Sequence, residues 1–141
     1  MAGPYYISTD SSKMDIDLIH NYLSEKSYWA KGRSKDLVKK SMKNSICFGA
    51  FDQNDEQIGF ARVATDYVVF AWVKDVFIVD NIKGQGIGQK LLQSIIDYPD
   101  LQQVNGIGLR TKDAQQFYMK FGFDTVPEPH TWMFKKNTLC E

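Results

Sequence analysis

Three glycines on alternate positions are the residues of this sequence best suited to binding chemistry. Gly84, Gly86 and Gly88 stand between a β-branched and aromatic segment and an apolar run of helical period. A glycine in the first helical turn weakens a helix by about 1 kcal/mol relative to alanine, so a plain turn does not account for three of them. The first N–H groups of a helix lack internal partners and lie at its positive end, and glycine leaves them uncovered. The spacing therefore predicts a cradle for a phosphate group.

Two other phosphate-binding patterns do not match this loop. The P-loop requires GxxxxGK followed by Ser or Thr, and KGQGIGQK (83–90) does not supply that pair. The dinucleotide fingerprint requires GxGxxG with an acidic residue about 20 positions later, whereas the spacing here is GxGxG. The phosphate must therefore belong to another class of ligand.

Asp75 is the carboxylate of the apolar segment 68–79, where a charge needs either a partner or a function. It could act as a general base, or it could pair with Lys74 or Arg62 or mark a sheet edge. His20 and His130 are the other candidates for acid–base chemistry, although their positions are typical of structural histidines. The two His and two Cys share no metal-ligand spacing, and no GxSxG or Cys–His signature predicts a hydrolase.

The elements that must position these residues follow from periodicity and turn signals. A strand at 5–8 precedes a helix from Asp15 to Lys26 and a second helix capped by Ser34. The later elements are predicted as a hairpin of strands 45–52 and 57–65, a third strand at 68–79, a helix after the glycines, a strand at 106–110, a helix at 113–123 and a last strand at 131–136. The order β-α-α-β-β-β-α-β-α-β predicts an α+β (mixed α/β) domain around an antiparallel meander.

Length and charge limit the class of protein. The 141 residues suit a single domain, 1–141, without repeats or linkers. Seventeen basic residues balance seventeen acidic ones, so we expect no nucleic-acid partner. The basic stretch 31–43 is either a solvated helix face or a positive rim for an anionic ligand. No apolar run predicts a membrane span and no leader predicts secretion, and Cys47 and Cys140 suit a reduced, cytoplasmic location.

Two motifs resemble those of one family, the GNAT superfamily of N-acetyltransferases. KGQGIG (83–88) resembles its pyrophosphate-binding loop, Q/R-x-x-G-x-G/A, and TKDAQQFYMKFGF (111–123) resembles its N-x-x-A-x-x-L-Y-x-x-x-G-F segment. The order of elements also matches, so the resemblance covers essentially the whole chain. Lys83 stands where Arg or Gln is usual, Asp80 replaces a common proline, and Thr111 replaces an Asn that often helps hold the cofactor. The family fold implies a twisted, mostly antiparallel sheet of six to seven strands with about four helices.

The resemblance implies a small acetyltransferase that uses acetyl-CoA, releases CoA and holds no metal. Tyr118 stands where the family places the acid that protonates the departing thiolate, although it could instead belong to an aromatic core stripe with Phe117, Phe121 and Phe123. Asp75 or a water relay would supply the base. The implied cofactor contacts are the strand residues Val76, Phe77 and Ile78, the loop residues Lys83, Gly84, Gln85, Gly86, Ile87 and Gly88, and Thr111 and Tyr118.

The acceptor is predicted to be a primary amine on a small molecule or peptide. In the family, the segment between the first two helices borders the acceptor site. Here it is YWAKGRS (28–34), in which Tyr28, Trp29 and Arg33 could contact the acceptor or form a turn whose Trp fills the core. The family also implies a possible homodimer. The alternative function is a non-catalytic acyl-CoA sensor or interaction module on the same fold.

Overall fold

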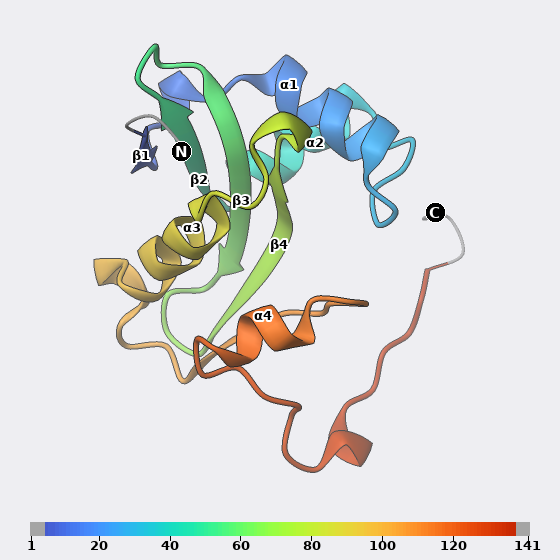
Figure 1. Cartoon of the computed structure of the whole chain (residues 1–141). Coiled ribbons are helices and arrows are strands. Elements are labelled where there is room, and N and C mark those ends of the chain that lie inside the picture. Colours follow the sequence, from blue (N-terminus) through green and yellow to red (C-terminus); the bar gives the residue numbers. More distant parts are fainter. Residues whose placement is uncertain (1–4, 138–141) are drawn as a thin grey trace. The chain divides into compact units, whose positions relative to one another are not determined.

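The computed structural model describes residues 5–137 in two compact units, the first ending at Leu109 and the second beginning at Arg110. The predicted α+β class and the order of elements up to the last helix are confirmed (Figure 1). Unit 1 contains the sheet, and unit 2 contains one short helix and extended chain.

The sheet of unit 1 has the strand order β1-β2-β3-β4-β5. Its strands are β1 (Tyr5–Ser8), β2 (Ile46–Asp52), β3 (Gln57–Thr65), β4 (Phe70–Ile78) and β5 (Gly106–Gly108). Neighbouring strands are antiparallel except β4 and β5, which are parallel. The predicted hairpin and its third strand are therefore present, with β4 as the last strand of the meander.

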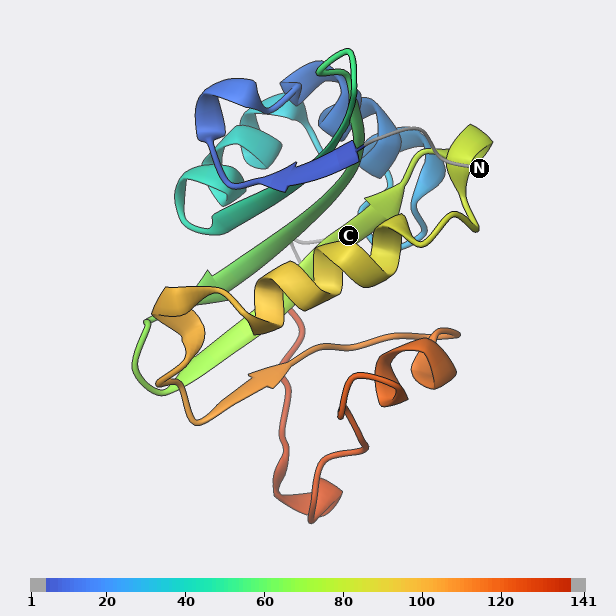
Figure 2. The same cartoon turned by 60° about the vertical axis from the view of Figure 1, so that its left-hand side comes forward.

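Helices cover both faces of this sheet. They are α1 (Ile16–Asn21), which continues into the π-helical turn η2 (Tyr22–Lys26), α2 (Lys35–Lys43) and α3 (Ile87–Ile96). Figures 1 and 2 show α3 against one face and α1 with α2 against the other. The burial of every residue in 46–51 of β2 agrees with this, because a strand covered on both faces has no solvated side.

Alternate residues of β2 belong to different halves of the core. Cys47 and Phe51 join the apolar cluster built on α1 and α2, whereas the ring of Phe48 contacts that of Tyr98 after α3, with centroids 5.3 Å apart. Helix α3 buries the predicted face: Ile87, Leu91, Leu92 and Ile95. The sheet is thus a rigid layer from which β4 leads into the glycine loop.

Side-chain caps begin the first two helices where the sequence predicts. Asp15 accepts a hydrogen bond from Leu18 N, and Ser34 accepts one from Leu37 N. Helix α2 buries Val38 and leaves Lys39, Lys40 and Lys43 exposed, as expected for a solvated basic face.

Unit 2 contains α4 (Gln115–Met119), shorter than the predicted helix 113–123. The chain leaves this helix at Gly122, whose φ of 90° is in the left-handed region, and Gly122 N donates to Met119 O at 3.2 Å. The last predicted strand, 131–136, is wrong. Pro129–Thr131 forms a 3₁₀ turn and residues 132–137 form no strand, since Pro127 and Pro129 lack the N–H groups of a ladder and unit 2 offers no partner strand among its described residues.

The strand number is also corrected. Residues 5–137 form one sheet of five strands, where six to seven were predicted. Three further 3₁₀ turns connect the elements of unit 1: Ser11–Lys13, Asp80–Ile82 and Pro99–Leu101. In the part of the chain that the structure describes, no helix is long and apolar enough to cross a membrane.

Candidate functional site

The glycine loop opens α3 with two left-handed residues. Gly84 has φ of 86°, and Gly86, the N-cap of α3, has φ of 83°, a conformation that L side chains rarely adopt. A Cβ atom at Gly84 would meet no heavy atom within 4 Å, whereas one at Gly86 would lie 3.2 Å from Gln89 Oε1. The loop therefore needs glycine for its backbone conformation, and the space beside Gly84 is open.

The main-chain N–H groups of this loop are available to a ligand. Within residues 5–137, the N–H groups of residues 83–89 donate to no acceptor, and the first bond inside the turn is that of Lys90 N to Gly86 O at 3.2 Å. Such donors at the positive end of a helix suit an anionic group, and the phosphate cradle that the glycine spacing indicates stays a prediction.

Strand β4 offers a second open feature beside this loop. On one edge it pairs with β3 along most of its length, but on the other β5 pairs only with Phe70, Ala71 and Trp72. Val79 N donates to Ile58 O at 3.0 Å, so the N–H of Ile78 points away from β3, because successive N–H groups of a strand face opposite edges. No strand among the described residues pairs with this edge at Val76, Phe77 and Ile78.

A bulge interrupts β4 between these residues and β5. Phe60 lies opposite Phe77 and Arg62 opposite Lys74, so two residues of β4 face one of β3. Asp75 occupies the bulge with φ of 57°, in the left-handed region that Asp tolerates better than most residues. The bulge turns the Asp75 carboxylate inward, where it is 1% exposed.

Both oxygens of the Asp75 carboxylate accept hydrogen bonds from unit 1. Trp29 Nε1 donates to Oδ1 at 3.0 Å, and Arg33 Nη1 and Arg62 Nε each donate to Oδ2 at 2.9 Å. Arg62 Nη1 also donates to Ser45 Oγ at 3.0 Å. We call Asp75, Arg33, Arg62 and Trp29 the inner ion cluster. Of the partners considered from the sequence, Arg62 is found; Lys74 is not part of this cluster.

The environment of Asp75 argues against its predicted role as general base. Burial alone raises the pKa of this carboxyl, but the charges and hydrogen bonds of Arg62 and Arg33 outweigh burial and leave the pKa below its usual value. A carboxylate with a lowered pKa and occupied oxygens is a weak proton acceptor. Its contacts are those of a group that fixes the 28–34 segment to β4.

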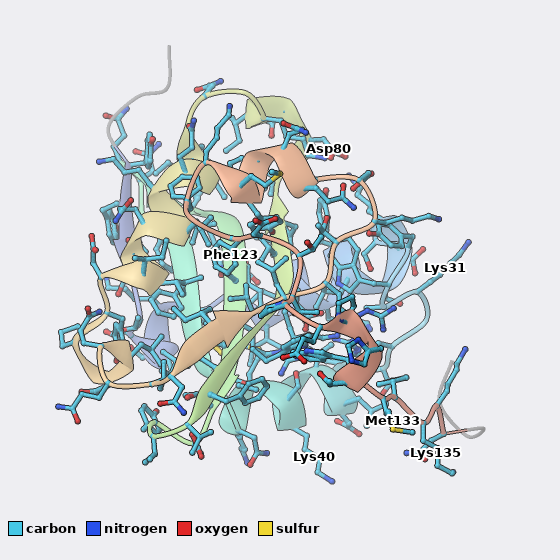
Figure 3. All side chains as sticks on the ribbon, turned by 90° about the horizontal axis from the view of Figure 1, so that it is seen from below. Lys31, Lys40, Asp80, Phe123, Met133 and Lys135 are labelled. Carbon is cyan, nitrogen blue, oxygen red and sulfur yellow. The ribbon has the colours of Figure 1, made fainter. Side chains whose placement is uncertain are left out.

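A second group of charges lies just after the C-terminal end of β4, in the turn Asp80–Ile82 that leads into the glycine loop. Asp80 Oδ2 pairs with Lys26 Nζ at 3.0 Å and Oδ1 with Lys83 Nζ at 3.0 Å, while Tyr22 Oη donates to Oδ1 at 3.3 Å. Hydrogen bonds from Lys26 and Lys83 lower the pKa of Asp80 to about 2, and the bond to Asp80 raises the pKa of Lys83. We call Asp80, Lys26, Lys83 and Tyr22 the outer ion cluster; Figure 3 shows Asp80 at the surface.

Tyr118 and Thr111 lie in unit 2 and are described within it. The ring centroid of Tyr118 is 5.1 Å from that of Phe117 and 5.9 Å from that of Phe123, so it belongs to a local aromatic group. Thr111 Oγ1 accepts a hydrogen bond from Ala114 N at 3.0 Å, which stabilises the turn into α4. The aromatic grouping is thus observed, and the acid role of Tyr118 stays a prediction.

The three residues predicted to contact the acceptor differ in burial and in their partners. Trp29 and Arg33 join the inner ion cluster, whereas Tyr28 is 57% exposed and contacts the ring of Trp29 edge-on at 5.1 Å. The sequence analysis missed Tyr22 and Lys26. Their only signal was a tyrosine and a lysine four residues apart at the end of a helix, which does not identify Asp80, 58 and 54 residues later, as their partner.

Other reactive side chains contribute little to this site. In the portion described, no group of three or more His, Cys, Asp or Glu could hold a metal ion. Burial raises the pKa of the Cys47 thiol to about 11, and its Sγ contacts Met42 O at 3.7 Å. A buried thiol with a high pKa is a poor nucleophile.

Comparison with known proteins agrees with the geometry. A family model for the acetyltransferase (GNAT) domain matches residues 43–125. The crystal structure of a GNAT-family protein from Xanthomonas campestris pv. campestris has a TM-score of 0.93 and 36% identity, covering 97% of this chain and 96% of that one. The uncharacterised N-acetyltransferase ycf52 of Pyropia yezoensis is 30% identical over 130 residues, which are 88% of this chain and 74% of that protein.

A more distant structure shares the fold alone. Glucosamine-6-phosphate N-acetyltransferase from Arabidopsis thaliana is 12% identical, with a TM-score of 0.66 over 96% of this chain. The glycine loop at α3, the open edge of β4 and these matches lead to one conclusion: the chain belongs to the GNAT family of acetyltransferases.

Proposed function

We propose that this chain transfers an acetyl group from acetyl-CoA to a primary amine, as one catalytic domain spanning residues 1–141. The observation that carries the proposal is the row of undonated N–H groups at residues 83–89, opened by left-handed Gly84 and Gly86. Those donors suit the diphosphate of CoA. Bound acetyl-CoA would supply an activated thioester.

The open edge of β4 suits the rest of the cofactor. Val76, Phe77 and Ile78 present a strand edge with which the amide-containing pantetheine arm can pair, as an added strand would. The N–H of Ile78 points to this edge and is available to the thioester oxygen as it gains negative charge. The loop, the strand edge and the start of α3 thus serve one elongated ligand.

Two proton transfers remain to be assigned. The incoming amine must be neutral, and a lysine-type amine has a pKa of about 10.4, so it must lose a proton before attack. We assign this step to solvent, because the Asp75 carboxylate is already held by three donors. We assign protonation of the departing thiolate to Tyr118, because its position in the family motif is that of the acid and a phenol is a suitable proton donor for a thiolate.

The acceptor-side proposal rests on the segment 28–34. Asp75 anchors Trp29 and Arg33, and the neighbouring Tyr28 is exposed. We therefore propose that Tyr28 contacts the acceptor while Trp29 and Arg33 position the segment. The basis for this proposal is the contrast in burial within one short stretch of chain.

Calorimetric titration with acetyl-CoA, CoA and ATP tests the cofactor assignment. We expect acetyl-CoA and CoA to bind and ATP not to bind at comparable concentration. Gly84→Ala should weaken CoA binding about tenfold, since a side chain in the left-handed region costs roughly 1–2 kcal/mol. Gly32→Ala is the matched control, because Gly32 is also left-handed, with φ of 79°, and a Cβ there also meets no atom within 4 Å but lies outside the loop.

Turnover on a panel of primary amines, followed by mass spectrometry of the acetylated product, tests the reaction. Tyr118→Phe should lower kcat about 100-fold while changing the Kd of acetyl-CoA by less than about twofold. CoA binding without turnover on any amine would favour the acyl-CoA sensor instead. Unchanged turnover in Tyr118→Phe would remove the acid assignment and leave the cofactor site intact.

A further inference from the structure

We propose that Lys26, on the turn η2, is a further ligand for the diphosphate of the cofactor, and that Asp80 holds its ammonium group until the diphosphate replaces the carboxylate. The inference rests on the proposed function, which assigns the diphosphate to the glycine loop. It adds a residue that lies 57 positions before Lys83 in the sequence.

The outer ion cluster brings Lys26 to the start of that loop. Lys26 and Lys83 each lie 3.0 Å from one oxygen of Asp80, so the same carboxylate holds both ammonium groups. Lys83 is the first residue of the row of undonated N–H groups. An anion bound to that row would therefore lie beside the side chain of Lys83. Lys26 is held next to Lys83 by the carboxylate that they share.

Both lysines lie beside a pair of stacked aromatic rings. The ring of Tyr22 stacks on that of Phe77 in β4, with centroids 4.1 Å apart and an interplanar angle of 7°. Lys26 Nζ lies 5.7 Å and Lys83 Nζ 5.9 Å from the centroid of the Tyr22 ring. Because Phe77 belongs to the strand that leads into the loop, this pair of rings is part of the same surface.

The charges of the outer ion cluster favour exchange of its anion. Two lysines against one aspartate leave one positive charge without a carboxylate, and the side chains of Lys26 and Asp80 are 56% and 54% exposed. Exposed ion pairs are weak, so breaking them costs little. A diphosphate carries more charge and more acceptor oxygens than one carboxylate, and it can accept from both lysines and from the loop.

The ligand chemistry follows from the position of the cluster. A single carboxylate in solution would compete with Asp80 on equal terms and gain nothing from the cluster. A diphosphate can use both the lysines and the N–H row, so we assign that group rather than a carboxylate-bearing acceptor. Lys26 is then a binding residue, with no part in proton transfer.

Lys26→Gln tests the inference with CoA and with pantetheine, which lacks the phosphates, as probes. We expect the Kd of CoA to rise about tenfold at low salt and that of pantetheine to stay the same. Lys40→Gln is the control: Lys40 is an exposed lysine of α2, and Figure 3 shows it on the opposite side of unit 1 from Asp80. Thermal unfolding of both variants checks that the fold is kept.

A second variant separates direct binding from mere support of the loop. If Lys26 binds the diphosphate, Lys26→Gln weakens CoA binding at least as much in the Asp80→Asn background as in the wild-type chain, because the carboxylate no longer competes for the ammonium group. Loss of that effect in the Asp80→Asn background would mean that Lys26 only holds Asp80, and would overturn the inference. So would wild-type CoA affinity in Lys26→Gln itself. Failure of the wild-type chain to bind CoA at all would instead overturn the proposed function.

Discussion

The inner and outer ion clusters each pair an aspartate with two basic side chains, Asp75 in the bulge of β4 and Asp80 just after that strand, but in different surroundings. Asp75 is 1% exposed and accepts from Trp29, Arg33 and Arg62, whereas Asp80 is 54% exposed and pairs with two lysines. Guanidinium groups hold a carboxylate in fixed directions, and a lysine ammonium behaves as a mobile point charge. Similar charges thus anchor structure where water is excluded, and where water has access they form weak pairs that we propose a ligand can replace.

The largest expected contrast is in stability. Asp75→Ala leaves the Arg33 and Arg62 guanidinium groups, on side chains only 14% and 12% exposed, without their partner and should lower the free energy of unfolding by about 3–5 kcal/mol. Asp80→Ala removes exposed pairs and should leave the denaturant midpoint near that of the wild-type chain. Guanidinium chloride unfolding of the two variants measures the difference. Equal midpoints would show that the inner ion cluster does not stabilise the fold.

Acid should break the inner ion cluster within a defined range of pH. The pKa of Asp75 is lowered in the folded chain, so the stability it provides is present above its unfolded value of about 3.9 and is lost as the pH falls through the folded value. Urea midpoints of wild type and Asp75→Ala should therefore differ by a constant amount from pH 8 to about pH 5 and converge below about pH 4. A difference that begins to shrink near pH 7 would contradict the lowered pKa.

Salt should produce the smallest effect and should act on the outer ion cluster alone. At about 1 M salt, charges are screened beyond about 3 Å, and exposed pairs lose what attraction they have. A double-mutant cycle on Lys26 and Asp80 should therefore give a coupling that disappears in high salt. The matching cycle on Arg33 and Asp75 should keep most of its coupling, because that carboxylate is buried. Similar salt dependence of the two cycles would remove the distinction between the clusters.

Much of the fold was predictable because its signals are local. The caps at Asp15 and Ser34, the hairpin and the apolar face of α3 depend on residues a few positions apart, and all are present. The alternation in 131–136 predicted a strand that is absent, and this absence could not be foreseen from the segment alone. A strand needs a partner, and no local pattern shows whether one is available.

In the candidate site, too, the features set by neighbouring residues were predictable, and those set by tertiary contacts were not. The glycine loop followed from the number and spacing of its glycines, and its left-handed residues agree with that prediction. The bulge at Asp75 depends on how β3 and β4 register, and the pairing with Arg33 joins residues 42 positions apart. The sequence drew attention to Asp75 as a charge in an apolar strand, but only the tertiary contacts distinguish an anchor from a base.

The burial of Cys47 has a practical consequence. Its thiol, with a pKa raised to about 11, is shielded from alkylating and disulfide reagents while β2 stays packed. In a chain carrying Cys140→Ser, the rate of Cys47 labelling therefore measures how often the sheet opens around β2. Comparing the labelling rate with and without CoA would measure how much ligand binding slows this opening, and no acetyl acceptor is needed.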